Sequence, residues 1–240
     1  MNELLLISQL VIFYAMVVFA YRFFGIKGLM CWTVVATIAA NIEVLVQIEA
    51  FGMNMTLGNI MFASTFAVTD VLSEVAGKKT AQKAVNIGIA TAVAFIIITQ
   101  SWLLFQPNEY DFAMPFMQAI FSNTPRLMLT GLVVYAIVQR FDVWLYHRIW
   151  ELTSKSTGRT RPYLWVRNNG STLVSQALNA VLFTFGAFYG VFETEVLFSI
   201  IVASYIIFMV TSLADTPVVY LCRYMKSRGM VEDEGTSNGF

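Results

Sequence analysis

The chain has 240 residues, of which 58% are hydrophobic and 12% are charged, and its mean hydropathy is +0.67. Soluble domains carry about 25% charged residues, so these charges are too few to cover a water-exposed globule, and lipid must face much of the surface. The net charge of zero gives no reason to expect a nucleic-acid partner.

The amino-terminal segment differs from a secretory signal peptide. A signal peptide begins with basic residues and ends at a small-residue cleavage site. Here the chain begins with Met1, Asn2 and Glu3, and its first apolar run ends in Tyr-Arg-Phe-Phe at 21–24. We therefore expect this run to be the first membrane span.

A membrane-spanning helix needs about 20 mostly apolar residues. Seven segments meet this requirement, at residues 4–24, 28–50, 57–75, 82–105, 125–147, 170–190 and 196–221. Residues 107–124 are expected to form a loop or a short interfacial helix, and residues 148–168 a basic loop. The pattern predicts an all-α membrane protein, a polytopic bundle of six to seven transmembrane helices, with the third segment as the one that could be broken or re-entrant.

Basic residues occupy alternate loops. They lie after the first, third, fifth and seventh segments: Arg22, Lys27, Lys78, Lys79, Lys83, Arg148, Lys155, Arg159, Arg161, Arg167, Arg223, Lys226 and Arg228. Lys and Arg mark the cytoplasmic side of a membrane protein. The amino terminus is therefore expected outside and the carboxyl terminus in the cytoplasm.

A single transmembrane transporter domain is expected over residues 1–228. The polar, glycine-rich segment 229–240 is expected to be a disordered cytoplasmic tail.

Catalytic and metal-binding signatures are missing from the sequence. It has no GxxxxGK[ST], GxSxG or HExxH motif. His147 is the only histidine, and Cys31 and Cys222 are expected to be free thiols. We therefore expect no enzyme activity, no cofactor and no metal.

The third segment carries two carboxylates, Asp70 and Glu74, which lie four residues apart on one predicted helix face. A charge at the centre of a membrane helix costs about 2.5–3.5 kcal/mol on insertion scales, so such residues are usually functional. Glu74 lies near the inner end, close to Lys78, where a salt bridge is the simpler interpretation. Asp70 lies about two turns from the inner end and is the stronger candidate.

Polar stripes also mark the fifth and sixth segments. Thr172, Gln176 and Asn179 follow helical spacing on the sixth segment. Tyr135, Gln139 and Asp142 share a face of the fifth, and Arg126 falls on the opposite face. These stripes either hydrogen-bond between helices or face a ligand.

Carboxylates and amides converging in mid-membrane suit a small, planar, polar solute. A carboxylate can accept two parallel N–H donors, an amide can pair with an amide edge, and Phe or Trp rings can stack on the faces of the solute. A purine-like ring meets this description.

Two motifs resemble the queuosine precursor transporter family, also labelled vitamin uptake transporters. They are FAVTDVLSEVAGKKTA at residues 66–81 and WVRNNGST at residues 165–172, followed by Gln176. The resemblance extends from about residue 30 to residue 222. It implies uptake of 7-deazaguanine bases across the bacterial inner membrane for modification of the tRNA wobble base.

The resemblance and the polar stripes together indicate a substrate-binding set, in which Asp70, Ser171, Thr172 and Gln176 are the strongest candidates. The full set is Asn41, Asp70, Glu74, Arg126, Gln139, Asn169, Ser171, Thr172, Gln176 and Asn179.

The chain departs from the family pattern at two positions. The family usually has Asp where this chain has Asn179 and Lys where it has Phe208. Loss of both charges is consistent with replacement of an ion pair by a neutral pair, since losing one alone would strand the other. Less charge near the site favours an uncharged base, such as the nitrile-bearing precursor, over an aminomethyl cation.

Three functional hypotheses remain open at this point. The first is a stand-alone carrier for a 7-deazapurine base, and the second is the substrate-binding membrane subunit of an ATP-driven, ECF-like vitamin or nucleobase importer. The third is a membrane enzyme or scaffold, for which no catalytic dyad is evident. The expected partners are the solute and the lipid bilayer, and a homodimer is compatible with the sequence.

Overall fold

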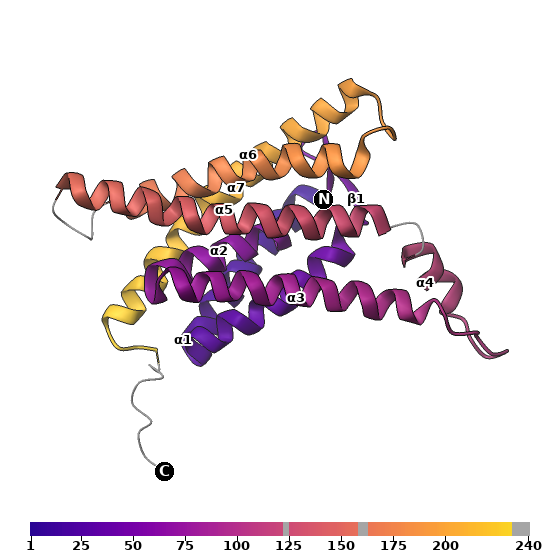
Figure 1. Cartoon of the computed structure of the whole chain (residues 1–240), viewed down its shortest axis with the longest axis horizontal. Helices are drawn as coiled ribbons and strands as arrows, with labels where there is room; N and C mark the ends of the chain where they lie inside the picture. Colours follow the sequence, from indigo (N-terminus) through magenta and orange to yellow (C-terminus); the bar gives the residue numbers. More distant parts are fainter. Residues whose placement is uncertain (122–124, 158–162, 232–240) are drawn as a thin grey trace, which may run out of the picture.

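Long helices run lengthwise through the molecule, as the computed structural model in Figure 1 shows. The structure describes residues 1–121, 125–157 and 163–231. The elements are α1 (Asn2–Glu43), β1 (Gln47–Ala50), β2 (Met53–Thr56), α2 (Gly58–Ala76), α3 (Lys78–Trp102), α4 (Met114–Phe121), α5 (Pro125–Thr157), α6 (Leu164–Phe188) and α7 (Thr194–Ser227).

The first element, α1, is a helical hairpin with two legs. Gly25 interrupts it with φ 57° and ψ −142°, a conformation that glycine adopts without steric cost. The rings of Phe13 and Trp32 lie 6.1 Å apart, whereas a straight helix would separate these residues by roughly 28 Å. The chain therefore reverses at Gly25, which separates the predicted first and second spans.

The two ends of the bundle differ in chemistry. The side chain of Asn2 donates a hydrogen bond to the carbonyl of Glu49, so the amino terminus lies beside the β1–β2 hairpin. The carboxyl-terminal end of α7 lies at the opposite end of the molecule (Figure 1). The end beside the β1–β2 hairpin is called the hairpin end. The opposite end carries Lys78, Arg167 and Arg223 and is called the basic end.

The central helix is α2, which packs against α1, α3, α5 and α7. Most of its residues are buried, including Thr69, Asp70 and Ser73. Enclosure by other helices removes α2 from lipid, so polar side chains on it can find protein partners.

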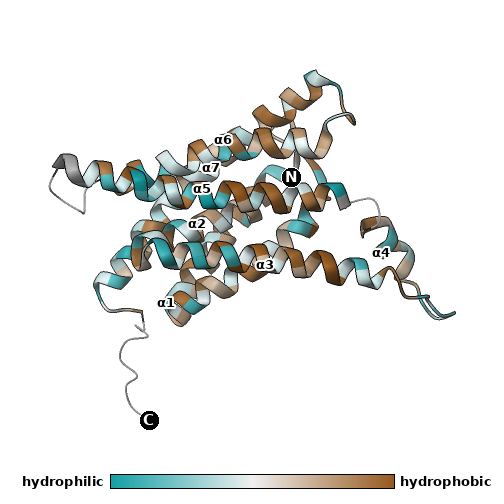
Figure 2. Ribbon diagram, in the orientation of Figure 1, coloured by the Kyte–Doolittle hydropathy of each residue, from teal (hydrophilic) through white to brown (hydrophobic). Residues whose placement is uncertain are grey.

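Five helices in the described part of the chain are long and apolar enough to cross a membrane, namely α1, α3, α5, α6 and α7. Their outward faces carry large apolar side chains, among them Phe19, Ile97 and Leu213. Figure 2 shows that hydrophilic residues on α3 and α5 gather toward the basic end. This distribution is typical of a protein whose solvent is a bilayer.

Two predicted boundaries were wrong, namely the end of the second segment and the extent of the basic loop. The second segment was expected to run to residue 50, but its helix ends at Glu43 and residues 47–50 form β1. Phe51 and Gly52 both have positive φ and form the two-residue turn of a hairpin in which Ala50 pairs with Met53. The helical pattern therefore stops where local turn chemistry favours paired strands.

The predicted basic loop at 148–168 is largely helical. Helix α5 continues to Thr157 and α6 begins at Leu164. No Gly or Pro interrupts residues 148–157, and Arg148 pairs with Glu151 one turn on. Residues 107–124 were expected to form a loop or a short interfacial helix, and they contain the short helix α4. Residues 232–240 of the predicted tail lie outside the described residues.

Candidate solute-binding site

A pocket lies among the helix ends nearest the hairpin. Both the second leg of α1 and α2 contribute to it, as do α3, α5, α6 and α7. Its aromatic lining is Phe62, Tyr135, Phe183, Phe188 and Phe208, and its polar lining includes Thr37, Asn41, Asn59, Asn179, Thr184 and Ser204. No Asp, Glu, Lys or Arg lines this pocket within the described residues.

The aromatic residues form one wall of the pocket. The ring of Phe62 lies 6.1 Å from Tyr135 and 6.2 Å from Phe208, both at steep angles. Tyr135 fits against α3 because residue 88 is glycine. A Cβ there would lie 2.1 Å from the Tyr135 hydroxyl. Such rings can stack on a flat solute.

Several pocket groups have unused hydrogen-bonding capacity. The amide nitrogen of Asn59 is buried without a partner, and the buried hydroxyls of Thr37 and Tyr135 have no side-chain partner other than each other. Buried polar groups are normally satisfied. These three are therefore suited to bind a polar solute.

A polar network continues from the pocket toward the basic end. The Gln139 amide donates a 2.7 Å hydrogen bond to the hydroxyl of Thr65, which lines the pocket. The Thr69 hydroxyl donates to the Gln139 oxygen at 3.3 Å. One residue further, Asp70 accepts a 3.0 Å hydrogen bond from Thr172 of α6. The network therefore joins α2, α5 and α6 through the centre of the bundle.

Two more carboxylates complete this buried network. Asp142 accepts a 2.6 Å hydrogen bond from the Ser175 hydroxyl, and Asp215 accepts a 2.7 Å bond from the Asn168 amide. Neither Asp142, Asp215 nor Asn168 belonged to the predicted site. Their signals were present in the sequence, since Asp142 shares a face with Gln139 and Asp215 is ionisable within a span.

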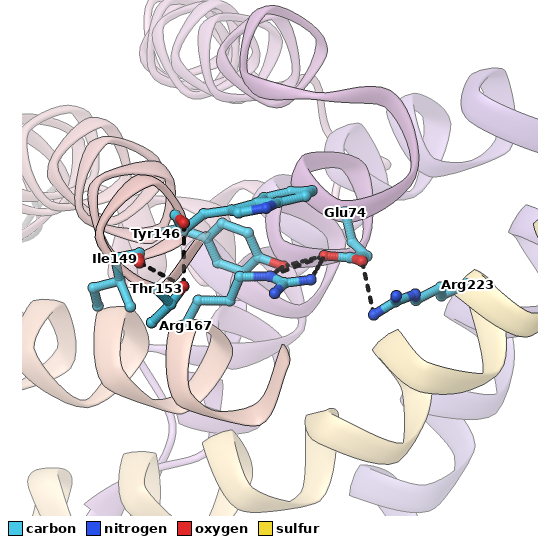
Figure 3. Close-up of polar contacts among 7 residues, drawn as sticks. Glu74, Tyr146, Ile149, Thr153, Arg167 and Arg223 are labelled. Carbon is cyan, nitrogen blue, oxygen red and sulfur yellow. Dashed lines mark hydrogen bonds and ion pairs between the residues drawn. The ribbon is translucent and has the colours of Figure 1, made fainter. Parts of the chain in front are cut away.

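An ion cluster closes the basic end (Figure 3). The Glu74 carboxylate lies 2.6 Å from Arg167 and 3.2 Å from Arg223, and it accepts a 2.9 Å hydrogen bond from Tyr146. The Arg167 guanidinium is fully buried and lies 4.2 Å from the centroid of the Trp150 ring. The cluster ties α2, α5, α6 and α7 together.

The ten predicted site residues fall into separate groups. Asn41 and Asn179 line the pocket. Asp70, Gln139 and Thr172 belong to the central network, and Glu74 belongs to the ion cluster instead of pairing with Lys78.

The remaining four have different surroundings. Gln176 is buried and its side-chain oxygen has no partner. Ser171 donates to the carbonyl of Asn168, and Asn169 donates to Thr216 of α7. Arg126 is exposed at the hairpin end and donates to the carbonyls of Gly186 and Tyr189 at the end of α6. The structure therefore does not bring all ten residues to one point.

A bundle with an apolar exterior, an aromatic-lined pocket at one end and buried charges at the other has the features of a membrane protein whose buried polar groups serve a function. The family model described as "putative vitamin uptake transporter" matches residues 56–222. The chain belongs to this family and is a multi-pass membrane protein.

One relative has a more specific description. The chain is 35% identical over 215 residues to the "probable queuosine precursor transporter" of Bacillus subtilis (strain 168). The aligned residues cover 90% of this chain and 92% of the relative. No solved structure matches the chain.

Proposed function

We propose that this protein imports queuosine precursors, the 7-deazaguanine bases, across the bacterial inner membrane. The similarity to the Bacillus relative supports this substrate class. The observation that carries the proposal is the pocket, because an aromatic wall beside hydroxyl and amide groups suits a planar ring with many donors and acceptors.

We further propose that residues 1–228 form one transporter domain that crosses the membrane seven times. The five apolar helices account for five crossings, the second leg of α1 for a sixth and α2 for a seventh. The basic end would face the cytoplasm. Reporter fusions after Lys27, Asn54, Lys79, Glu109, Lys155, Thr194 and Lys226 should alternate in, out, in, out, in, out, in, and two adjacent fusions on one side would exclude this topology.

The described conformation then corresponds to an outward-facing state. The pocket lies at the hairpin end, on the proposed outer side, and the Glu74 cluster holds four helices together at the inner end. A base would bind between Asn41 and Asn179 against the aromatic wall. It would reach Asp70, Thr172 and Gln176 as the helices rearrange to open the inner end.

Uptake by the purified protein tests the proposal. Liposomes that contain only this chain should exchange a labelled nitrile-bearing 7-deazaguanine for unlabelled base, and adenine should compete poorly. Exchange only after addition of an ATP-driven module would favour the importer-subunit alternative instead. Absence of both exchange and binding would exclude 7-deazaguanines as substrates.

The uncharged pocket lining predicts a preference for the neutral base. Asn179 and Phe208, the two positions that depart from the family pattern, both line the pocket. Asn179→Asp or Phe208→Lys alone should lower stability in detergent, because each buries an unpaired charge. The double variant should recover part of the loss, with an interaction free energy of roughly 0.5–3 kcal/mol in a double-mutant cycle.

Competition between the neutral and the cationic base for uptake by these variants tests the predicted preference. If Asn179 contacts the base, the variants that carry Asp at position 179 should shift preference toward the aminomethyl cation. Strictly additive single effects on thermal unfolding would show that positions 179 and 208 do not interact.

A further inference from the structure

Three buried aspartates in the central network have no cationic partner. Asp70, Asp142 and Asp215 are each at most 1% exposed, and none forms an ion pair within the described residues. They lie within electrostatic range of one another. Three ionised carboxylates held this way would be strongly destabilising.

The same region lacks hydrogen-bond donors. Asp70 Oδ1 is buried without a partner, although the other oxygen of Asp70 accepts a bond from Thr172. Asp142 accepts a bond from the Ser175 hydroxyl and also lies beside the Ser171 hydroxyl. The side-chain oxygens of Gln176 and Asn168 are also buried and unpartnered, and Asn168 is in direct contact with Asp215. Three acceptors without donors beside buried carboxylates indicate that the region takes up a positive charge or a hydrogen-bond donor.

The arrangement is not a typical site for a transition-metal ion. Within the described residues, no three acidic, His or Cys side chains are grouped so that they could hold one metal ion. A proton on a carboxyl group removes a charge and supplies a donor at the same time. Protonation of one carboxyl group therefore reduces the unbalanced negative charge and supplies a missing hydrogen-bond donor.

We propose that Asp142 binds a proton that enters the cell together with the transported base. This inference rests on the proposed uptake function. A proton from the outer side adds to the Asp142 carboxylate while the basic end is closed. When the Glu74 cluster separates, water reaches the carboxyl group and the proton leaves to the cytoplasm, which restores the carboxylate.

The groups around Asp142 and Asp70 are consistent with proton binding by Asp142. The Tyr14 hydroxyl of α1 donates to the carbonyl of Thr211, and the Tyr146 hydroxyl of α5 donates to Glu74. Asp215 of α7 adds a further carboxyl group. Other ionisable groups on the surrounding helices are Glu74 of α2, Arg140 and His147 of α5, Arg167 of α6, and Arg223 and Lys226 of α7. Lys78, Lys79 and Lys83 lie in the first turns of α3.

The test compares Asp142→Asn with wild type in liposomes that contain the full chain. Asn mimics the protonated acid and can still accept from Ser175, so exchange of labelled nitrile-bearing 7-deazaguanine should continue. An inward gradient of one pH unit should accumulate the base about tenfold in wild type for one proton per base, and not at all in the variant. Glu151→Gln is the control, because Glu151 is an exposed carboxylate on the same helix and pairs with the exposed Arg148.

The outcomes separate this inference from the proposed function. If wild-type protein exchanges the base but ignores the pH gradient, or if Asp142→Asn retains gradient-driven accumulation, proton coupling through Asp142 is excluded and base uptake stands. If no exchange occurs, base uptake itself fails. Infrared spectroscopy of the purified protein then decides on the proton site, because a neutral-acid C=O band that disappears in Asp142→Asn supports it and the absence of such a band overturns it.

Discussion

Glu74→Gln is expected to destabilise the protein by about 3–5 kcal/mol, because it removes one partner of a buried ion pair. The Arg167 guanidinium has no solvent exposure and lies 2.6 Å from the Glu74 carboxylate. A neutral amide cannot balance this charge, and the Trp150 ring at 4.2 Å compensates only in part. Thermal unfolding in detergent measures the effect.

A matched control is available on the same protein. Glu151→Gln removes the partner of Arg148, but both side chains of that pair are more than half exposed, at 59% and 53%. Exposed pairs contribute about 0–1 kcal/mol, so this variant should unfold close to wild type. Equal losses for the two substitutions would show that the cluster at the basic end does not hold the helices together.

The Glu74 variant should also change access to the basic end. If the cluster closes the inner side, its loss should favour states in which that side is open. A cysteine introduced at Ser212, which is buried on α7, should then react faster with a water-soluble thiol reagent in the Glu74→Gln background. This comparison requires Cys31 and Cys222, which are both free thiols, to be replaced first.

Asp70→Asn is expected to weaken binding of the base about ten- to a hundredfold. Loss of a hydrogen bond to a charged group costs roughly 1.5–3 kcal/mol, and the unpartnered Oδ1 of Asp70 can accept a ring N–H donor once the base has reached it. Because Asn has the same shape and can still accept from Thr172, expression and thermal stability should stay near wild type. Equilibrium binding of the labelled base to purified protein measures the change.

The control for Asp70 lies on the same helix. The Ser73 hydroxyl is fully buried and has no hydrogen-bond partner, so Ser73→Ala should leave both affinity and stability close to wild type. Wild-type affinity in Asp70→Asn would mean that the Asp70–Thr172 bond only holds α2 against α6.

Local sequence patterns were sufficient to find the helices. Apolar runs of span length predicted α1, α3, α5, α6 and α7, because a helix satisfies its own backbone within one segment. The reversal between residues 24 and 28 was also predictable, since Gly25 falls between two apolar runs. Helix ends were harder to locate, as Glu43 and Thr157 show, because pairing of β1 with β2 and side-chain pairs along α5 decide them.

Some residues of the central network were also predictable from the sequence. Asp70, Gln176 and Asn179 are noticeable in the sequence because polar groups are costly in an apolar helix, so each must have a partner or a function. The helical spacing also placed Tyr135, Gln139 and Asp142 on one face, and all three are buried.

The sequence by itself determined that this protein is a helical membrane protein of the transporter family, with carboxylates and amides inside its spans. Only the tertiary structure decided which of these groups meet. Glu74 and Arg167 are 93 residues apart, and Asp70 and Thr172 are 102 residues apart. Spacing along one helix determines the face of a residue but not the neighbouring helix, which is chosen by packing of the whole bundle. For this reason Asn41 and Asn179 reach the pocket, while Arg126 binds the end of α6.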